Sequence, residues 1–368
     1  MDDALNEEPA AVSIRTAAER GCPHFMTTLV TGATGFVGSH VARQLVSAGY
    51  PVRILIRKNS NLQAVEGLSV EPIEADLQDR ASLERAMKGV RLVFHAAADY
   101  RLWARDPREI YRTNVEGTRF LLEAAFREGV QRIVYTSTVA TVAVPQAGDA
   151  LPNEETRATL DQMIGHYKRS KFLAEAEALK AAGAGVPVVI VNPTAPVGPA
   201  DWKPTPTGRI IVDFLNGKMP AYVDTGLNVA PVEDVANGHL LAAEKGRIGE
   251  RYILGGLNMT LKQILDSLAA IAGRPAPRFK LPHVVALAAG YADEWFSRLA
   301  GREPRIPVEG VRMSRHRMFV ATGKAERELG YHAGSVEAAL ERAVCWYEEH
   351  GNVKGRAARG ETAQAAAA

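Results

Sequence analysis

The sequence predicts an α/β protein with a doubly wound parallel sheet and a smaller C-terminal lobe. A glycine-rich turn, residues 32–38, stands between an apolar run and a helical pattern. Strand patterns rich in Val and Ile then alternate with helical patterns as far as residue 192, which is typical of parallel β-α-β units with both sheet faces covered. Beyond residue 192 the chain is rich in proline and short turns, and this change predicts a second lobe.

The elements expected in the first part of the chain alternate between strand and helix. The expected strands span residues 26–31, 51–56, 69–73, 91–96, 131–136 and 186–191. The expected helices span residues 36–48, 81–88, 107–127 and 160–182. In the second part we expect helices at 232–243, 261–272 and 336–350 and a strand at 251–254.

These elements divide the chain into four parts. Residues 1–25 precede the first strand, and we expect a disordered extension there. Residues 26–192 are expected to form a Rossmann-like nucleotide-binding domain, to which segments near 228–255 return. Residues 193–350 are expected to form a substrate-binding lobe, and the Ala- and Gly-rich residues 351–368 a disordered tail.

Composition excludes several classes of protein. A formal net charge of +2 over 368 residues gives no basic bias, so we predict no nucleic-acid partner. The two cysteines are expected to be free thiols, as in a reducing cytosol, and the apolar neighbours of Cys345 predict that it is buried. The acidic start has no signal core, no apolar run reaches spanning length and no membrane-binding helix is evident, so we predict a cytoplasmic protein without membrane insertion. We predict no metal site.

The glycine turn predicts a site for a dinucleotide. Glycines at this spacing let the backbone turn sharply and approach a pyrophosphate, while the amides at the start of the following helix face the anion. The residues expected to line this part of the site are Gly32, Thr34, Gly35, Phe36, Val37 and Gly38.

Tyr167 and Lys171 are the expected catalytic pair. They lie four residues apart on a predicted helix and therefore share one face. A lysine ammonium favours the phenolate form of a neighbouring tyrosine, so Tyr167 can exchange a proton with a carbonyl or alcohol oxygen. Hydroxyls at the end of the preceding strand, on Thr136, Ser137 and Thr138, are expected to supply a third partner for the substrate oxygen.

The end of the second strand predicts the choice of cofactor. An acidic residue there would bind the ribose 2′-hydroxyl of NAD, whereas an arginine would accept the 2′-phosphate of NADP. The chain has Arg57 and Lys58 at this place and no acid, so NADP(H) is favoured over NAD(H). Asp76, before Leu77, is expected either to bind the adenine amino group or to cap a helix. Ala96, Ala97 and Ala98 leave room for the cofactor, and His95 is expected to be structural.

Taken together, these motifs resemble the extended short-chain dehydrogenase/reductase superfamily over residues 26–350. Within it the chain is similar to the dihydroflavonol-4-reductase-like branch, and looks closest to the hopanoid-associated sugar epimerases through residues 98–104, 164–172 and 203–209. The superfamily elements that match are residues 31–38, Asp76 with Leu77, residues 95–98, residues 114–118, residues 136–138, Tyr167 with Lys171, and Asn192 with Pro193.

The resemblance implies further roles. Thr138 would take the place of the catalytic Ser or Thr, Asn114 would support Lys171 through a water relay, and Pro193 and Val197 would contact the nicotinamide. The helices expected at 107–127 and 160–182 would pair subunits into a homodimer. One departure concerns the substrate, because residues 226–235 lack the arginine that nucleotide-sugar epimerases carry there. Candidate substrate contacts are Tyr100, Arg101, Trp103 and Arg209.

Two functions of different class follow. The first is an NADP-dependent oxidoreductase or epimerase that moves hydride at a secondary alcohol or ketone of a small-molecule substrate, either a sugar or a dihydroflavonol- or sterol-like compound, with Tyr167 as general acid/base. The second is a catalytically idle protein that senses NADP. Retention of both Tyr167 and Lys171 favours the enzyme.

Overall fold

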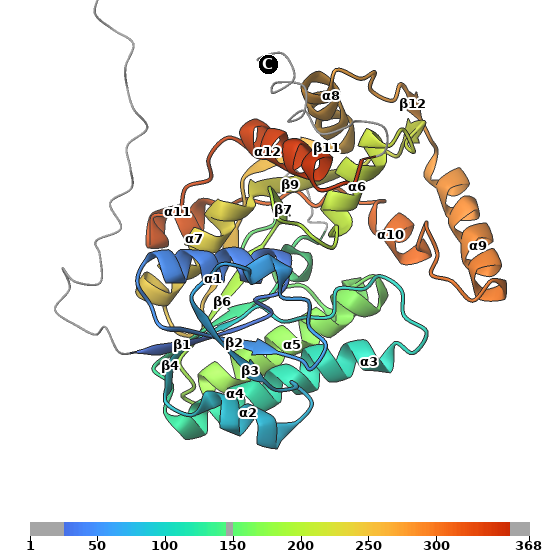
Figure 1. The fold of residues 1–368 in the computed structure, drawn as a ribbon. Helices are drawn as coiled ribbons and strands as arrows, with labels where there is room; N and C mark the ends of the chain where they lie inside the picture. The colour runs from blue at the N-terminus through green and yellow to red at the C-terminus, as the bar shows by residue number, and fades with distance from the viewer. Residues whose placement is uncertain (1–25, 145–149, 354–368) are drawn as a thin grey trace, which may run out of the picture.

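The structure, a computed structural model, describes residues 26–144 and 150–353 in two lobes (Figure 1). The larger lobe is built on a seven-stranded sheet with the order β10-β6-β5-β4-β1-β2-β3, in which every neighbouring pair is parallel. Its strands are β1 (Thr27–Thr31), β2 (Val52–Ile56), β3 (Val70–Glu74), β4 (Val90–His95), β5 (Arg132–Thr136), β6 (Val188–Pro193) and β10 (Arg251–Leu254). The predicted doubly wound parallel sheet is therefore confirmed.

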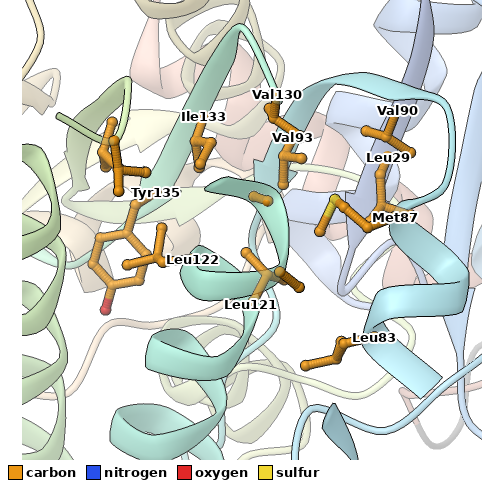
Figure 2. Close-up of a cluster of buried hydrophobic side chains, with 14 of the residues drawn as sticks. Leu29, Leu83, Met87, Val90, Val93, Leu121, Leu122, Val130, Ile133 and Tyr135 are labelled. Carbon is orange, nitrogen blue, oxygen red and sulfur yellow. The ribbon is translucent and has the colours of Figure 1, made fainter. Parts of the chain in front are cut away.

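Helices cover both faces of this sheet, which is why an inner strand such as β6 is buried along its whole length, whereas the edge strand β3 is largely exposed. On one face a core forms beneath α2 (Arg80–Met87), α4 (Gly117–Glu128) and α5 (Gly165–Gly183). Figure 2 shows this core, where Leu121 of α4 and Met87 of α2 meet strand residues such as Leu29 and Ile133. The other face packs against α1 (Phe36–Ser47), α7 (Val232–Lys245) and α11 (Gly323–Leu329).

Two of the expected helices are interrupted. The helix expected at 107–127 is α3 (Arg108–Tyr111), then a π-helical turn (Arg112–Glu116), then α4. The helix expected at 160–182 is wrong at its start, because a separate 3₁₀ turn (Leu160–Gln162) comes first and α5 begins only at Gly165. Gly165 has φ of 82°, a left-handed conformation that breaks a continuous helix.

The smaller lobe has its own sheets and its own core. A three-stranded sheet joins β7 (Ala195–Val197), β9 (Gly226–Pro231) and β11 (Leu257–Thr260), and a two-stranded one joins β8 (Ala221–Tyr222) to β12 (Phe279–Lys280). The core lies among α6 (Pro206–Leu215), α8 (Leu261–Ala272) and α12 (Val336–Glu349). Between β9 and β11 the chain passes through α7 and β10, so it returns to the large sheet before completing the small one.

Two expectations about the C-terminal part need correction. Cys345 is exposed on α12, because its neighbours Val344 and Trp346 take the buried positions of the helix. Residues 351–353, expected to belong to a disordered tail, are part of the fold instead, since Val353 is only 5% exposed and packs in the core of the smaller lobe. In addition, residues 275–320, where no element was expected, contain β12, α9 (His283–Leu299) and α10 (Val308–Met313). The expectations for residues 1–25 and 354–368 lie outside the described residues.

Candidate active site

The glycine turn after β1 lies in backbone contact with the residues that follow β4. Gly32 has φ of 72°, and a Cβ added to it would lie 2.6 Å from the amide nitrogen of Ala97. A Cβ on Gly38 would collide with the carbonyl oxygen of Gly32. Any larger residue would therefore push α1 away from β1, or the β1 turn away from residues 96–98 that follow β4.

The start of α1 has the properties of an anion site. Gly35 is the N-cap residue, no side chain caps the helix, and its first turn has no acidic residue. The positive end of the helix and its free amides are thus available to a phosphate. Together with the close glycine turn, which leaves no room for a Cβ, this arrangement fits the pyrophosphate of a dinucleotide. Thr34, Phe36 and Val37 are half-buried around it.

Arg57 and Lys58 follow β2 directly and are both exposed. The amide of Arg57 donates to the hydroxyl of Ser60 over 2.9 Å, which folds residues 57–60 into a turn. Asp76 is also exposed after β3, where its carboxylate accepts from the amide of Gln78 over 2.8 Å. The cap of α2 is Asp79 instead, so the capping alternative for Asp76 is wrong for that helix. Leu77 is buried.

Lys171 lies in the interior with two partners. Its ammonium donates to the hydroxyl of Tyr135 over 2.9 Å and to the carbonyl oxygen of Thr136 over 2.8 Å. Burial lowers the pKa of Lys171 to about 7, because removing water disfavours the charged form, although Glu175 opposes this. The lysine therefore contacts the end of β5, which carries the three predicted hydroxyls.

These three hydroxyls have different surroundings. Thr136 pairs with the imidazole of His239 at 3.0 Å, which occupies its side chain. Ser137 is 5% exposed, and its hydroxyl has no hydrogen-bond partner among the described residues. The side chain of Thr138 interacts with the phenol of Tyr167. This interaction lowers the pKa of Tyr167, but burial raises it by more, so the phenol is neutral at ordinary pH.

A buried polar network fixes the backbone of Thr138. The amide of Asn192 donates to the carbonyl oxygen of Thr138 over 3.1 Å and to the carboxylate of Glu175 over 2.8 Å. Glu175 also pairs with Arg251 of β10 at 3.2 Å. Sequence reasoning matched Asn192 but missed Glu175, whose only sequence signal is its position one turn beyond Lys171 on α5.

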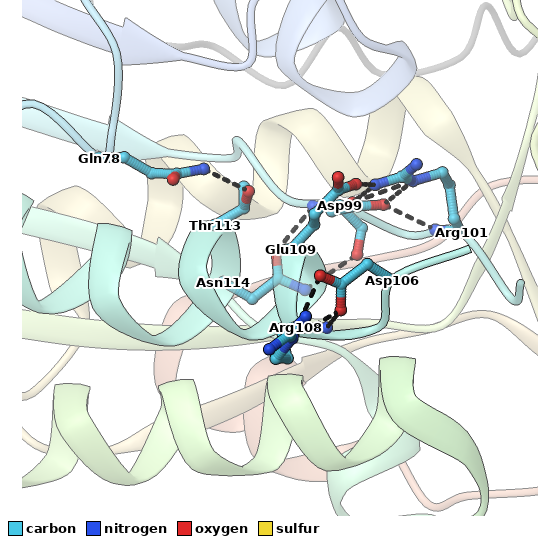
Figure 3. Close-up of polar contacts among 8 residues, drawn as sticks. All are labelled: Gln78, Asp99, Arg101, Asp106, Arg108, Glu109, Thr113 and Asn114. Carbon is cyan, nitrogen blue, oxygen red and sulfur yellow. Dashed lines mark hydrogen bonds and ion pairs between the residues drawn. The ribbon is translucent and has the colours of Figure 1, made fainter. Parts of the chain in front are cut away.

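Asn114 connects the loop after β4 to α5. Its amide donates to the carbonyl oxygen of Asp99 over 2.9 Å, and its oxygen accepts from the amide of Asp99 over 2.7 Å (Figure 3). The same amide also donates to the hydroxyl of Ser170 over 2.9 Å. It lies at the centre of the π-helical turn, a distortion often found at functional sites. None of the three bonds reaches Lys171, so the direct contacts of Asn114 position the loop rather than the lysine.

The candidate substrate residues differ in availability. Arg101 is paired with Asp99 at 2.6 Å and with Glu109 at 3.1 Å, so its guanidinium is already engaged (Figure 3). Tyr100 is 37% exposed, and Trp103 is half-buried. Arg209 is exposed on α6.

The two residues expected at the nicotinamide end different strands. Pro193 is the last residue of β6, paired with Leu254 of β10, and Val197 ends β7 beside Pro231 of β9. Both are buried where the chain passes from the large sheet to the small one.

Lys168 is a further residue that the sequence analysis missed. It is 8% exposed, and its ammonium lies 3.8 Å from the sulfur of Met318, with no acidic partner among the described residues. Burial lowers its pKa to about 8. Its place directly after Tyr167 was the available signal. His95, by contrast, is buried between Thr31 at 2.7 Å and Thr118 at 3.1 Å, as a structural role requires.

Comparisons with known proteins extend over both lobes. A model of the "NAD dependent epimerase/dehydratase family" matches residues 28–255. The chain is 45% identical over 329 residues to a Synechocystis sp. protein named "Putative dihydroflavonol 4-reductase", covering 88% of this chain and 95% of that one. It is 37% identical over 333 residues to sterol demethylase protein B of Methylococcus capsulatus, covering 89% and 100%. The crystal structure of gox2253 is 45% identical with a TM-score of 0.79, covering 90% and 100%.

Proposed function

We propose that this chain, which belongs to the NAD dependent epimerase/dehydratase family, is an NADP(H)-dependent reductase of ketones with Tyr167 as general acid/base. The family makes it an enzyme that uses a nicotinamide cofactor. The cofactor type, the acid and the substrate are the proposal. The observation that carries it is the set formed by the half-buried Tyr167 and Thr138, whose side chains interact, and by the buried Lys171 on the same helix as Tyr167.

Each member of this set has a role that its surroundings support. When bound, NADPH supplies the hydride that reduces a carbonyl carbon. Tyr167 is neutral because burial raises its pKa, so it donates its proton to the carbonyl oxygen. Thr138 orients that phenol and donates a second hydrogen bond to the oxygen. Lys171 protonates readily near pH 7, and its charge stabilises the phenolate that remains.

The cofactor would be held by backbone at one end and by cations at the other. The amides of Gly35 to Gly38 would bind the pyrophosphate at the start of α1, with Gly32 and residues 96–98 giving close approach. Arg57 and Lys58, exposed at the end of β2, would bind the 2′-phosphate, a contact that contributes about 1.5–3 kcal/mol. Asp76 and Leu77 would lie at the adenine, and Pro193 and Val197 at the nicotinamide.

The substrate we propose is a dihydroflavonol- or sterol-like ketone rather than a nucleotide sugar. A diphosphate-linked sugar needs positive partners, but residues 226–235 contain no arginine and Arg101 is already paired with Asp99 and Glu109. Tyr100 and Trp103 would instead stack on a polycyclic body. Two similar proteins carry names from dihydroflavonol and sterol chemistry, which supports the same substrate class.

The test is NADPH consumption over a panel of dihydroflavonols and ketosteroids, with Tyr167→Phe as the variant and the exposed Tyr50→Phe as the matched control. Tyr167→Phe should lower kcat by about 10²–10⁴-fold while NADPH binding is kept. Tyr50→Phe should behave like the wild type. Full activity in Tyr167→Phe would refute the assigned acid. If the wild type binds NADPH tightly but none of the tested ketones leads to NADPH consumption, the NADP-sensing alternative replaces the reductase.

A further inference from the structure

The outer face of α9 is apolar. Its exposed side chains include Val284 (78%), Trp295 (59%), Phe296 (58%) and Leu299 (70%), and Figure 1 shows the helix at the periphery of the smaller lobe. Val284, Trp295 and Leu299 recur at helical spacing, so they share one side of the helix. Phe279, just before the helix, is 76% exposed. A soluble surface seldom leaves so many large apolar side chains in one segment.

The acidic residues of α9 point away from this face. Asp293 accepts from the amide of Ile306 over 2.8 Å, and Glu294 accepts from the amide of Val308 over 2.8 Å. These two carboxylates hold the segment that leads into α10 against the inner side of α9. The only basic residue of the helix proper is Arg298, which is exposed.

The sequence segment that contains this helix is basic, although two of its cations, Lys280 and Arg317, pair with Asp224. Residues 278–317 contain eight Lys or Arg and four Asp or Glu, an excess of four positive charges, whereas the whole chain carries +2. Arg278, Arg305 and Arg315 are exposed and have no ion-pair partner among the described residues. The segment therefore combines an exposed apolar stripe with unpaired cations.

We infer that α9 docks on an anionic membrane surface. An amphipathic helix with aromatic and aliphatic residues on one side and cations around it lies in the interface between headgroups and acyl chains. Anionic lipids attract such cations, and Trp prefers this depth. None of the helices in the two described ranges is long and apolar enough to cross a membrane, and lying on the surface does not require it. A second copy of the chain is the poorer occupant, because pairing two α9 faces would bring two basic segments together.

Docking there would bring the membrane close to the candidate site. Glu309 of α10 accepts from the amide of His166 over 3.2 Å, directly beside Tyr167 at the start of α5. Leu102, in the candidate substrate loop, lies against Gly310 of the same short helix. The inference itself concerns binding alone and does not depend on the proposed reaction.

The experiment is flotation of the full chain with vesicles of phosphatidylcholine, with and without phosphatidylglycerol. The wild type should float with the anionic vesicles only, and binding should fall at about 1 M salt, where charges are screened within about 3 Å. The double variant Trp295→Ser with Leu299→Ser should bind at least about tenfold more weakly. The matched control is Ile248→Ser with Leu257→Ser, which removes side chains of similar exposure, 54% and 48%, from other surfaces.

A second double variant tests the contribution of the positive charges. Arg305→Gln with Arg315→Gln should also weaken binding about tenfold, since each cation near an anionic surface contributes to attraction. Arg85→Gln with Lys88→Gln on α2, also exposed, should not. Unchanged NADPH binding and melting temperature show that each variant folds. Equal flotation with neutral vesicles, or no flotation of the wild type, overturns the inference. Loss of a lipid-free dimer in the α9 variant, without vesicle binding, identifies a self-interface instead.

Discussion

The central sheet and α9 use similar apolar residues in opposite ways. All six residues of β6 are buried between two helical layers, whereas α9 leaves Trp295, Phe296 and Leu299 more than half exposed. An apolar sequence pattern therefore indicates that a helix or strand is present, but it does not indicate which surface packs against that helix or strand. In the sheet the covering helices belong to the same chain, but nothing in the described residues covers the outer face of α9.

The most direct way to break this comparison is to truncate one leucine from each region. Leu121 of α4 is fully buried, and Leu121→Ala should lower the free energy of unfolding by about 2–5 kcal/mol through lost burial and a cavity. Leu299→Ala, at 70% exposure, should change it by less than about 0.5 kcal/mol. Urea unfolding of both variants measures the difference. Equal losses would mean that α9 packs against something in solution.

Two glycines allow the same comparison between a closely packed and an open position, with a single Cβ atom as the change. Gly38→Ala should destabilise the protein by about 1–3 kcal/mol and weaken NADPH binding, because the new methyl collides with the carbonyl oxygen of Gly32. Gly183→Ala at the end of α5 meets no atom within 4 Å and should be neutral or stabilise by up to about 1 kcal/mol. Thermal unfolding and NADPH titration test both. A well-tolerated alanine at position 38 would argue against the close turn.

Two exposed arginines give the next test. The effect of substituting each one on cofactor binding should depend on its position in the fold, because both carry the same charge. Arg57→Asp should weaken NADPH binding about 10–100-fold and leave NADH binding unchanged or improved, since the carboxylate repels a 2′-phosphate and accepts from a ribose hydroxyl. Arg305→Asp, near α9, should leave both constants as they are. Fluorescence titration with the two cofactors gives the values. If the Arg57→Asp variant still binds NADPH more tightly than NADH, a group other than Arg57 binds the 2′-phosphate.

The smallest expected effect, taken per pH unit, is the pH dependence that buried Lys171 adds. Its pKa of about 7 in the folded protein lies below the ordinary value of about 10.4, so the unfolded chain binds more protons between these two values. Stability should therefore rise with pH from about 7 to 10, by at most about 1.4 kcal/mol per pH unit. Lys171→Met should flatten this rise in the free energy of unfolding, while Lys58→Met, at an exposed site, should not. An unchanged slope in Lys171→Met would mean that the lysine is charged throughout.

The sequence predicted best what the local backbone determines. The turn at Gly32 and Gly38 leaves no room for a Cβ, and most of the strands are rich in Val and Ile, so the strands of the large sheet were placed to within two residues. The start of α5 was misplaced, because a glycine with positive φ is not distinguishable in sequence from one inside a helix.

What the sequence did not predict depends on contacts between distant segments. The pairing of Arg101 with Glu109 and the burial of Lys168 against Met318 arise only when both partners are placed. Helix α9 was missed for a different reason. Its outer face is apolar and its inner face carries Asp293, Glu294 and Ser297, which reverses the pattern that identifies a surface helix.

The central claim, a reductase that exchanges NADP(H) at every turnover, is tested most directly by mass spectrometry of the nucleotide released when freshly purified protein is denatured. We expect substoichiometric nucleotide that carries a 2′-phosphate, together with reversible rebinding of NADPH. Near-stoichiometric NAD would contradict it, because a tightly retained cofactor without the phosphate is what an epimerase cycle requires and would leave Arg57 without its proposed role.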